Sequence, residues 1–169
     1  AKSNGPSKVE VNLYLGQALL LKEPAVPKDA ENAFESGLKS MGFAKKGFIN
    51  REWDRKSVTQ WLEKESDKKK RQLAADVFKG LLEATYLRED WRSAIEKMDA
   101  FEGLIKGSQI EQRTRVLAGE AHEKLGGFKE AAAAYEAAAT LKGVDASELA
   151  AYTVIAGLIL NLDEVITKQ

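Results

Sequence analysis

The chain has 169 residues, of which 44% are hydrophobic and 31% charged, so it is long enough to bury one core of ordinary size. Basic and acidic residues number 26 each, and the resulting net charge of zero disfavours strong nonspecific binding to nucleic acid. The absence of cysteine excludes disulfides, thiolate catalysis and thiolate metal sites, and the content of only three prolines suits a mainly helical protein.

The N-terminal segment, residues 1–8, reads AKSNGPSK and is expected to be flexible because it is polar. The chain begins at Ala1 without an initiator methionine. Either a targeting peptide has been removed, as in a processed periplasmic or organellar protein, or the chain is a fragment.

Residues 9–42 are predicted to form the first helical hairpin. The apolar stretch Val9–Lys22 predicts one helix with most of its circumference buried. Two prolines in residues 23–29 break this helix. We expect a second helix to begin at Lys28 or Asp29 and to continue to the end of the hairpin.

Residues 43–66 are predicted to be either a degenerate repeat or an insertion. Residues 43–54 show no helical period, whereas residues 55–65 read as a short amphipathic helix. Asp54 is a candidate cap for the start of this helix. The residues expected to face inward are Val58, Trp61 and Leu62.

The charged run KESDKKKR, residues 64–71, permits two interpretations. It could be an anion or nucleic-acid patch centred on Lys68–Arg71. We favour a solvated helix start, because Glu65 with Lys69, and Asp67 with Arg71, have the i,i+4 spacing of helical ion pairs.

A second hairpin is predicted over residues 72–106. Residues 72–88 form a strong helical pattern, and Asp90-Trp91 turns the chain into the next helix. Two glycines in residues 103–109 then permit a loop before the following hairpin.

The third hairpin, residues 109–142, carries the clearest pattern in the chain. Gly126-Gly127 separates two helices, since glycine adopts the left-handed conformation of a helix C-cap at no steric cost. Small residues occur where the two helices would touch, with larger rings between them, so close antiparallel packing is expected. The small residues are Ala118, Gly119, Ala121, Ala131 and Ala138, and the large ones are Phe128 and Tyr135.

This spacing resembles the tetratricopeptide repeat (TPR) family, whose unit has about 34 residues. With Gly119 as the eighth residue of a repeat, Ala131, Tyr135 and Ala138 are the twentieth, twenty-fourth and twenty-seventh. A similar alternation of small and large side chains recurs upstream. It involves Gly16, Ala18, Ala30, Phe34, Gly37, Ala94 and Met98. The alternative is an alanine-rich helical hairpin with no family relation.

The resemblance implies an all-α fold: a right-handed α-solenoid of helix-turn-helix (TPR-like) repeats in a single domain, residues 9–169. An inserted helix interrupts the repeats, and a hydrophobic C-terminal helix, residues 145–167, follows them. Phe101 stands where the family prefers a small residue, so a looser helix contact is expected there.

The C-terminal helix contains an uncharged run of fourteen residues, Leu149–Leu162. This run is shorter than the roughly 20 residues of a transmembrane helix, so we predict no transmembrane span. A buried helix is the favoured interpretation. We hypothesise that it docks against a partner, another copy or a continuation of the array.

Residues with catalytic potential are few, and we predict neither an enzyme nor a cofactor or metal site. His122 is the only histidine and is interpreted as a packing residue, the alternative being a catalytic or ligand role. Glu120 and Glu123 do not share one helix face with it. No glycine-rich loop precedes Lys-Ser/Thr, and no serine lies in a nucleophile elbow.

The resemblance implies a non-enzymatic scaffold that binds a protein or peptide segment in the groove lined by the first helix of each repeat. The groove residues implied are Asp76, Lys79, Glu83 and Tyr86, and then Arg113, Glu120, Glu123 and Lys124. Glu83 replaces the asparagine of the family's carboxylate clamp, so acidic chaperone tails are unfavoured partners. The mixed charge favours a partner segment with both signs, or a groove filled by the chain itself.

The alternative function is a structural subunit or assembly factor of a larger complex, including a membrane-associated one, with self-association also open. It would dock through the aromatic insertion and the C-terminal helix. The residues expected at this docking surface are Trp53, Trp61, Leu158 and Leu160. A nucleic-acid binder is the third and least favoured hypothesis.

Overall fold

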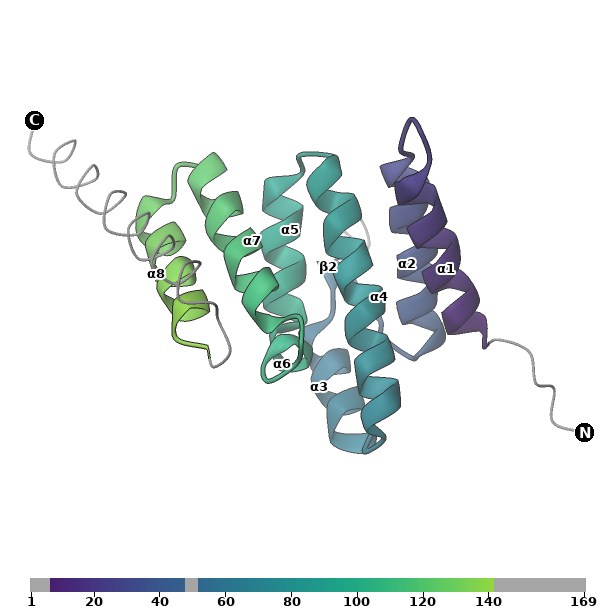
Figure 1. Ribbon diagram of the computed structural model, residues 1–169. Helices are drawn as coiled ribbons and strands as arrows, with labels where there is room; N and C mark the ends of the chain where they lie inside the picture. Colours follow the sequence, from purple (N-terminus) through teal and green to yellow (C-terminus); the bar gives the residue numbers. More distant parts are fainter. Residues whose placement is uncertain (1–6, 48–51, 142–169) are drawn as a thin grey trace, which may run out of the picture. The chain divides into compact units, whose positions relative to one another are not determined.

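The computed structural model describes residues 7–47 and 52–141, and the chain divides into two compact units. Unit 1 is residues 1–108 and unit 2 is residues 109–169. The described residues form eight α-helices and one pair of two-residue strands, so the prediction of a mainly helical protein is confirmed (Figure 1). The predicted C-terminal helix, with Leu158 and Leu160, lies outside the described residues.

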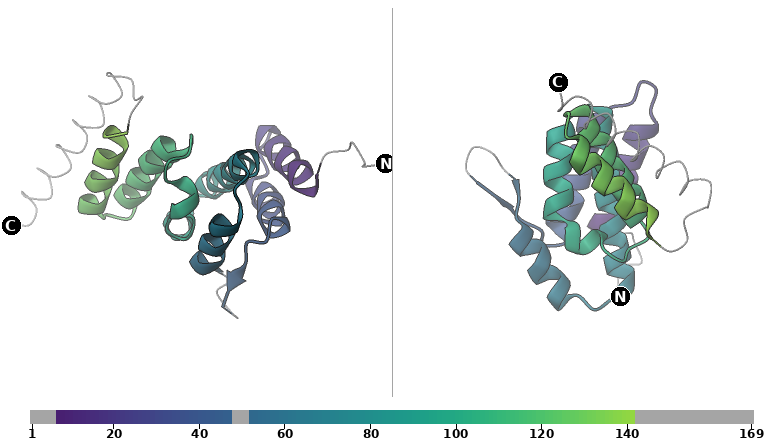
Figure 2. Two further views of the ribbon diagram at one scale, coloured as in Figure 1. Left: turned by 90° about the horizontal axis from the view of Figure 1, so that it is seen from below. Right: turned by 90° about the vertical axis from the view of Figure 1, so that its left-hand side faces the viewer.

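Unit 1 contains six of these helices and both strands. Its elements are α1 (Lys8–Leu21), α2 (Pro27–Ser40), β1 (Lys45–Lys46), β2 (Glu52–Trp53), α3 (Arg55–Lys64), α4 (Lys68–Leu87), α5 (Trp91–Ala100) and α6 (Glu102–Ile105). Helices α1, α2 and α4 contact one another, while the strands and α3 lie to one side of them (Figure 2).

The packing of α1, α2 and α4 centres on one phenylalanine. Phe34 of α2 is fully buried, and its ring tip faces Gly16 of α1 and Gly80 of α4. A Cβ atom built at either glycine would lie closer than 3.0 Å to three atoms of the ring. The three helices can therefore pack this closely only because both positions lack a side chain.

Helix α1 differs from its prediction in how much of it is covered. The structure buries only Leu13 and Gly16, and leaves Val11, Tyr14, Leu15 and Leu21 exposed. The prediction of a mostly buried circumference is wrong because, within the described chain, α1 packs against α2 and α4 on one side. Ser7 caps the helix and pairs with Glu10 in a capping box.

Helix α2 begins at Pro27, one residue before the predicted start. Proline suits the first position of a helix, since the N–H that it lacks would have no partner inside the helix. A proline that was interpreted only as a helix breaker is therefore also the first residue of the next helix.

The irregular segment before α3 contains a short antiparallel strand pair. Lys45 pairs with Trp53 and Lys46 with Glu52. Asp54 then caps α3 as predicted, because its side chain accepts a hydrogen bond from the backbone N–H of Lys56 at 3.2 Å. Trp53, at the end of β2, is buried in unit 1, and its ring packs edge-on against Phe101.

An aromatic cluster forms the second part of the core of unit 1. Phe101 is fully buried, stacks on Phe78 at a centroid distance of 4.5 Å and meets Phe43 and Trp53 edge-on at 5.3 Å. A looser helix contact was expected at Phe101, but its side chain is instead closely packed in this cluster. A large side chain fits here because α5 ends at Ala100 and the strand pair fills the space beside it.

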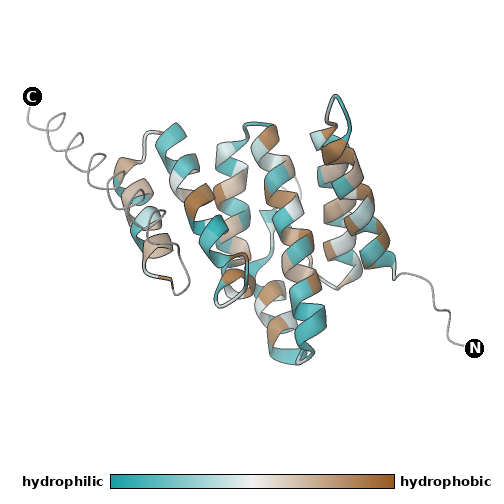
Figure 3. Cartoon of the chain, viewed as in Figure 1, coloured by the Kyte–Doolittle hydropathy of each residue, from teal (hydrophilic) through white to brown (hydrophobic). Residues whose placement is uncertain are grey.

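Helix α4 begins at Lys68, so the basic run forms its first turn (Figure 3). Asp67 caps the helix through the backbone N–H of Lys69 at 2.8 Å. The solvated helix start is confirmed, but its partners differ from those expected. Glu65 pairs with Lys70 at 3.3 Å, and Arg71 donates hydrogen bonds to the backbone carbonyls of Leu62 and Glu65.

Unit 2 is described from residue 109 to residue 141 and forms one helical hairpin, α7 (Glu111–Lys124) and α8 (Phe128–Ala139). Gly126 has a φ angle of 78°, and Gly127 donates a hydrogen bond to the carbonyl of His122 at 2.8 Å. This arrangement is a Schellman C-cap. The predicted role of Gly126 as the helix terminator is confirmed.

The contact between α7 and α8 has the predicted small and large side chains. Tyr135 is buried over Gly119, where an added Cβ atom would lie 2.6 Å from the ring. Ala131 and Ala138 are fully buried on either side of Tyr135. The phenylalanine and glycines of unit 1 and the tyrosine and glycine of unit 2 thus follow the same packing rule.

In the described part of the chain, no helix has the length and apolar character needed to cross a membrane.

Candidate functional site

The predicted groove residues of unit 1 lie along one face of α4. Lys79 and Glu83 are exposed and form an ion pair at 3.7 Å. Asp76 is partly buried and accepts a hydrogen bond from Gln72 at 2.9 Å. Tyr86 is also partly buried and contacts the ring of Trp91 edge-on. The face therefore presents both charges to solvent, as the sequence indicates.

The predicted groove residues of unit 2 lie on α7. Arg113, Glu123 and Lys124 are exposed, whereas Glu120 is partly buried. Glu123 accepts a hydrogen bond from the Tyr135 hydroxyl at 3.2 Å. The ring that packs between α7 and α8 therefore also holds one of the predicted groove carboxylates in place.

The predicted aromatic docking residues belong to the core of unit 1. Trp53 is only 5% exposed, and Trp61 is partly buried with its ring 4.8 Å from that of Phe43. Neither side chain stands out from the surface. The two rings instead pack in the second part of the core, Trp61 against Phe43 and Trp53 against Phe101.

His122 is partly buried near the end of α7, and its backbone carbonyl accepts hydrogen bonds from the backbone N–H groups of Leu125 and Gly127. Its position fits the interpretation as a packing residue. Among the described residues, no group of three or more histidine, aspartate or glutamate side chains is placed to hold a metal ion.

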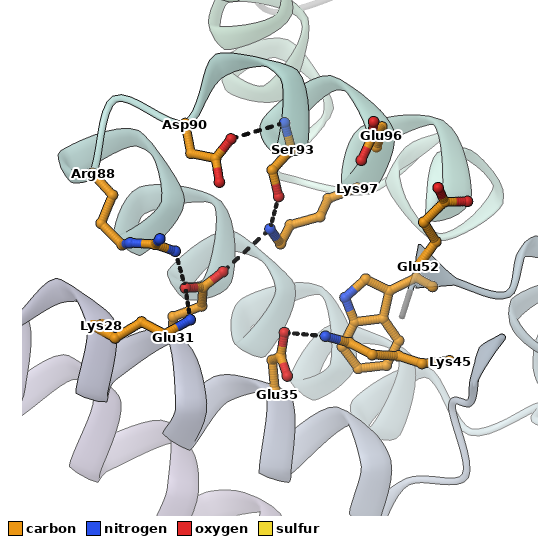
Figure 4. A pocket seen from close by; sticks show the side chains of 11 residues that line it. Lys28, Glu31, Glu35, Lys45, Glu52, Arg88, Asp90, Ser93, Glu96 and Lys97 are labelled. Carbon is orange, nitrogen blue, oxygen red and sulfur yellow. Dashed lines mark hydrogen bonds and ion pairs between the residues drawn. The ribbon is translucent and has the colours of Figure 1, made fainter. Parts of the chain in front are cut away.

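A polar pocket of about 330 Å³ lies within unit 1 (Figure 4). It is lined by residues of α2, both strands and α5, together with Arg88 at the end of α4. Helix α1 contributes no residue to its wall. Most of the lining side chains are charged.

One part of the pocket wall is a buried ion network around Glu31. Its carboxylate pairs with Lys28 at 3.1 Å, with Lys97 at 3.2 Å and with Arg88. Glu31 is 4% exposed and Lys97 6%. Burial acts to raise the pKa of Glu31, but the charge of Lys97 and the hydrogen bond and charge of Lys28 lower it below its ordinary value. The carboxylate is therefore ionised at neutral pH.

A second network surrounds Glu35, one helical turn further along α2. Glu35 pairs with Lys45 of β1 and with Lys39 at 3.3 Å. The Lys45 ammonium also lies 5.0 Å from the centre of the Trp53 ring, a cation–π distance. The two networks connect α2 to the α4–α5 corner and to the strand pair.

Three further carboxylates line the pocket without a cation at ion-pair distance among the residues the structure describes. Glu52 and Glu96 are exposed, and Asp90 caps α5 by accepting the backbone N–H of Ser93 at 3.3 Å. Ser93 in turn accepts a hydrogen bond from the buried Lys97. The cap residue is thus linked through Ser93 to the Glu31 network.

No known protein family, characterised protein or solved structure matches the chain. The functional argument therefore rests on the geometry of the α4 face and of the polar pocket.

The sequence contains a weak signal of this pocket. Glu31 interrupts the buried stripe of Ala30, Phe34 and Leu38, and Lys97 lies between the buried Ala94 and Met98 on α5. A charged residue inside an apolar stripe is costly unless it is paired. The signal therefore indicates that each residue has a partner, although it does not indicate which one.

Proposed function

We propose that the chain is a non-enzymatic helical-repeat scaffold that binds a segment of another protein through the exposed face of α4, and that the exposed face of α7 is a second contact surface of the same kind. We further propose that its hairpins are TPR-like repeats of a right-handed α-solenoid. The observation that supports the proposal is that both units pack an aromatic ring of one helix over glycine of a neighbouring helix. In unit 1 the ring of Phe34 packs over Gly16 and Gly80, and in unit 2 the ring of Tyr135 packs over Gly119.

Repeated hairpins support a binding role because each one buries its apolar face against its neighbours and leaves one face of its first helix outside. On α4 this outer face carries Lys79 and Glu83, with half-exposed side chains of opposite charge. An exposed ion pair of this kind contributes only about 0–1 kcal/mol to stability. These charges are therefore available to select a partner at little cost to the fold.

Site-specific photocrosslinking tests the proposal. A photoreactive residue at position 79 should crosslink a partner from the native source, whereas the same residue at position 64, on the exposed end of α3, should not. Charge reversal by Lys79→Glu or Lys124→Glu should weaken that partner's binding while the helical circular dichroism stays unchanged. Equal crosslinking at positions 79 and 64 would contradict the proposal.

A second candidate function is a structural subunit of a larger complex, and the exposed apolar face of α1 favours it. Tyr14 is 60% exposed and Leu21 82%, with Val11 and Leu15 beside them. This face would bury an apolar helix of another subunit. Because Trp53 is buried and Trp61 is partly buried, α1 replaces the aromatic insertion in this alternative. Tyr14→Lys with Leu15→Lys would abolish such assembly and leave binding at Lys79 unchanged.

A further inference from the structure

The polar pocket has an uneven distribution of charge. Among the residues that line it, Lys28, Arg88 and Lys97 all contact Glu31, and Lys45 contacts Glu35. Four cations therefore share two carboxylates. The remaining acids, Glu52, Asp90 and Glu96, are without a cation at ion-pair distance in the described part of the chain.

The charged groups with spare bonding capacity lie at different ends of the pocket. Figure 4 shows Lys28 and Arg88 towards one end, with Asp90 near them, and Glu52 and Glu96 towards the other, acidic end, with Lys45 near them. Lys45 is already paired with Glu35, and Asp90 caps α5. The end with Lys28 and Arg88 has spare hydrogen-bond donors. Arginine has five N–H groups and lysine three, and the side chains of Arg88 and Lys28 remain 31% and 62% exposed beside Glu31. The acidic end is open to solvent, because Glu52 and Glu96 are both exposed.

The size and total charge of the pocket restrict its ligand further. A volume of about 330 Å³ is near the lower limit for small-molecule sites, which start at about 300 Å³. The lining contains five acids and four bases, so a ligand with a large net negative charge would be repelled. A small molecule with one negative and one positive group matches both ends.

We propose that this pocket binds a small zwitterion of the amino-acid class. Its carboxylate accepts hydrogen bonds from Lys28 and Arg88, and its ammonium group pairs with Glu52 and Glu96. The site is separate from the proposed partner-binding face of α4, since α4 contributes only its C-terminal Arg88. The inference therefore stands or falls independently of the scaffold proposal.

The indole N–H resonance of Trp53 provides a reporter inside the full chain, because the Trp53 ring lines the pocket. The chain has three tryptophans, so a ¹⁵N-correlated spectrum has three indole signals and Trp53→Phe identifies the one required. The probes are glycine, L-alanine, γ-aminobutyrate and ε-aminocaproate, which separate the two charges by different lengths. Propionate, propylamine and phosphate carry one kind of charge only.

At least one zwitterion is expected to shift the Trp53 signal in a saturable way, with an affinity at least about tenfold above those of propionate, propylamine and phosphate. The double variant Glu52→Gln, Glu96→Gln should weaken binding by about tenfold or more, as should Lys28→Gln. None of these changes removes Glu31 or Lys97, so the fold should persist. Glu63→Gln, an exposed carboxylate on α3, is the matched control and should bind like the wild type.

Three outcomes would overturn the inference. The first is the absence of a saturable shift with any zwitterion. The second is binding of propionate or phosphate as strong as that of the best zwitterion, which would indicate a simple anion site. The third is a response only to a blocked Lys-Glu dipeptide, which would indicate that the pocket recognises side chains of a polypeptide.

Discussion

Replacement of Gly80 by alanine tests the packing on which the fold depends. The new Cβ atom would lie within 3.0 Å of three atoms of the Phe34 ring, and Gly16 confines the same ring from the α1 side. The ring has no room to retreat, because Phe34 is fully buried. Overpacking of this kind costs about 1–3 kcal/mol.

The expected free-energy change is the difference between two effects. Alanine is favoured over glycine inside a helix by about 0.8–1.0 kcal/mol, which offsets part of the overpacking cost. Because the ring is confined from both sides, we expect the upper part of the overpacking range and a net destabilisation of about 1–2 kcal/mol. Urea denaturation followed by circular dichroism measures this change.

A double-mutant cycle isolates the contact. In a Phe34→Leu background the ring is absent, so Gly80→Ala should cost nothing or stabilise the protein through helix propensity. Gly103→Ala is the control, because its Cβ atom meets only the end of the flexible Leu62 side chain at 3.0 Å. A Gly80→Ala variant as stable as the wild type, or a cycle without coupling, would refute the packing argument.

Three further predictions concern the pocket, the aromatic cluster and the C-cap. Glu31→Gln should destabilise the protein by about 3 kcal/mol at pH 7, since Lys97 stays buried without its partner. Because the pKa of Glu31 is lowered in the folded chain, this difference should be present at neutral pH and should shrink in acid titrations of stability, as the pH falls from the ordinary pKa of a glutamate through the lowered pKa of Glu31. Trp53→Phe should change the unfolding free energy in urea by less than about 1 kcal/mol, because it removes a buried indole N–H without a described partner. Gly126→Ala should lower the free energy of unfolding by about 1 kcal/mol, because alanine is strained at a φ angle of 78°. Thermal denaturation should show this as a lower midpoint temperature.

The parts of the fold that sequence predicted well depend on neighbours in the chain. The Gly126 C-cap, the Asp54 cap of α3 and the stripe around Tyr135 each involve residues on one helix or one hairpin. Helical periodicity and cap chemistry act over a few residues, so a single sequence contains them. The strand pair was not predicted because two-residue strands have no measurable period.

The candidate pocket could not be assembled from sequence because its partners are distant. Arg88 and Glu31 are 57 residues apart, and no local rule pairs them. The same limit applies to the surface of α1 and to Trp53. An apolar helix face and an aromatic ring look alike in sequence whether they are buried in the core or available to a partner, and only the packing of α2, the strands and α5 separates the two cases.

The central claim, that the exposed charges of α4 select a partner, is tested most directly by exchanging them. The double variant Lys79→Glu, Glu83→Lys retains an ion pair within the helix but inverts the pattern that the partner meets. The affinity of the partner crosslinked at position 79 should fall by about tenfold or more, with unchanged stability in urea. Unchanged affinity in a folded double variant would contradict the claim.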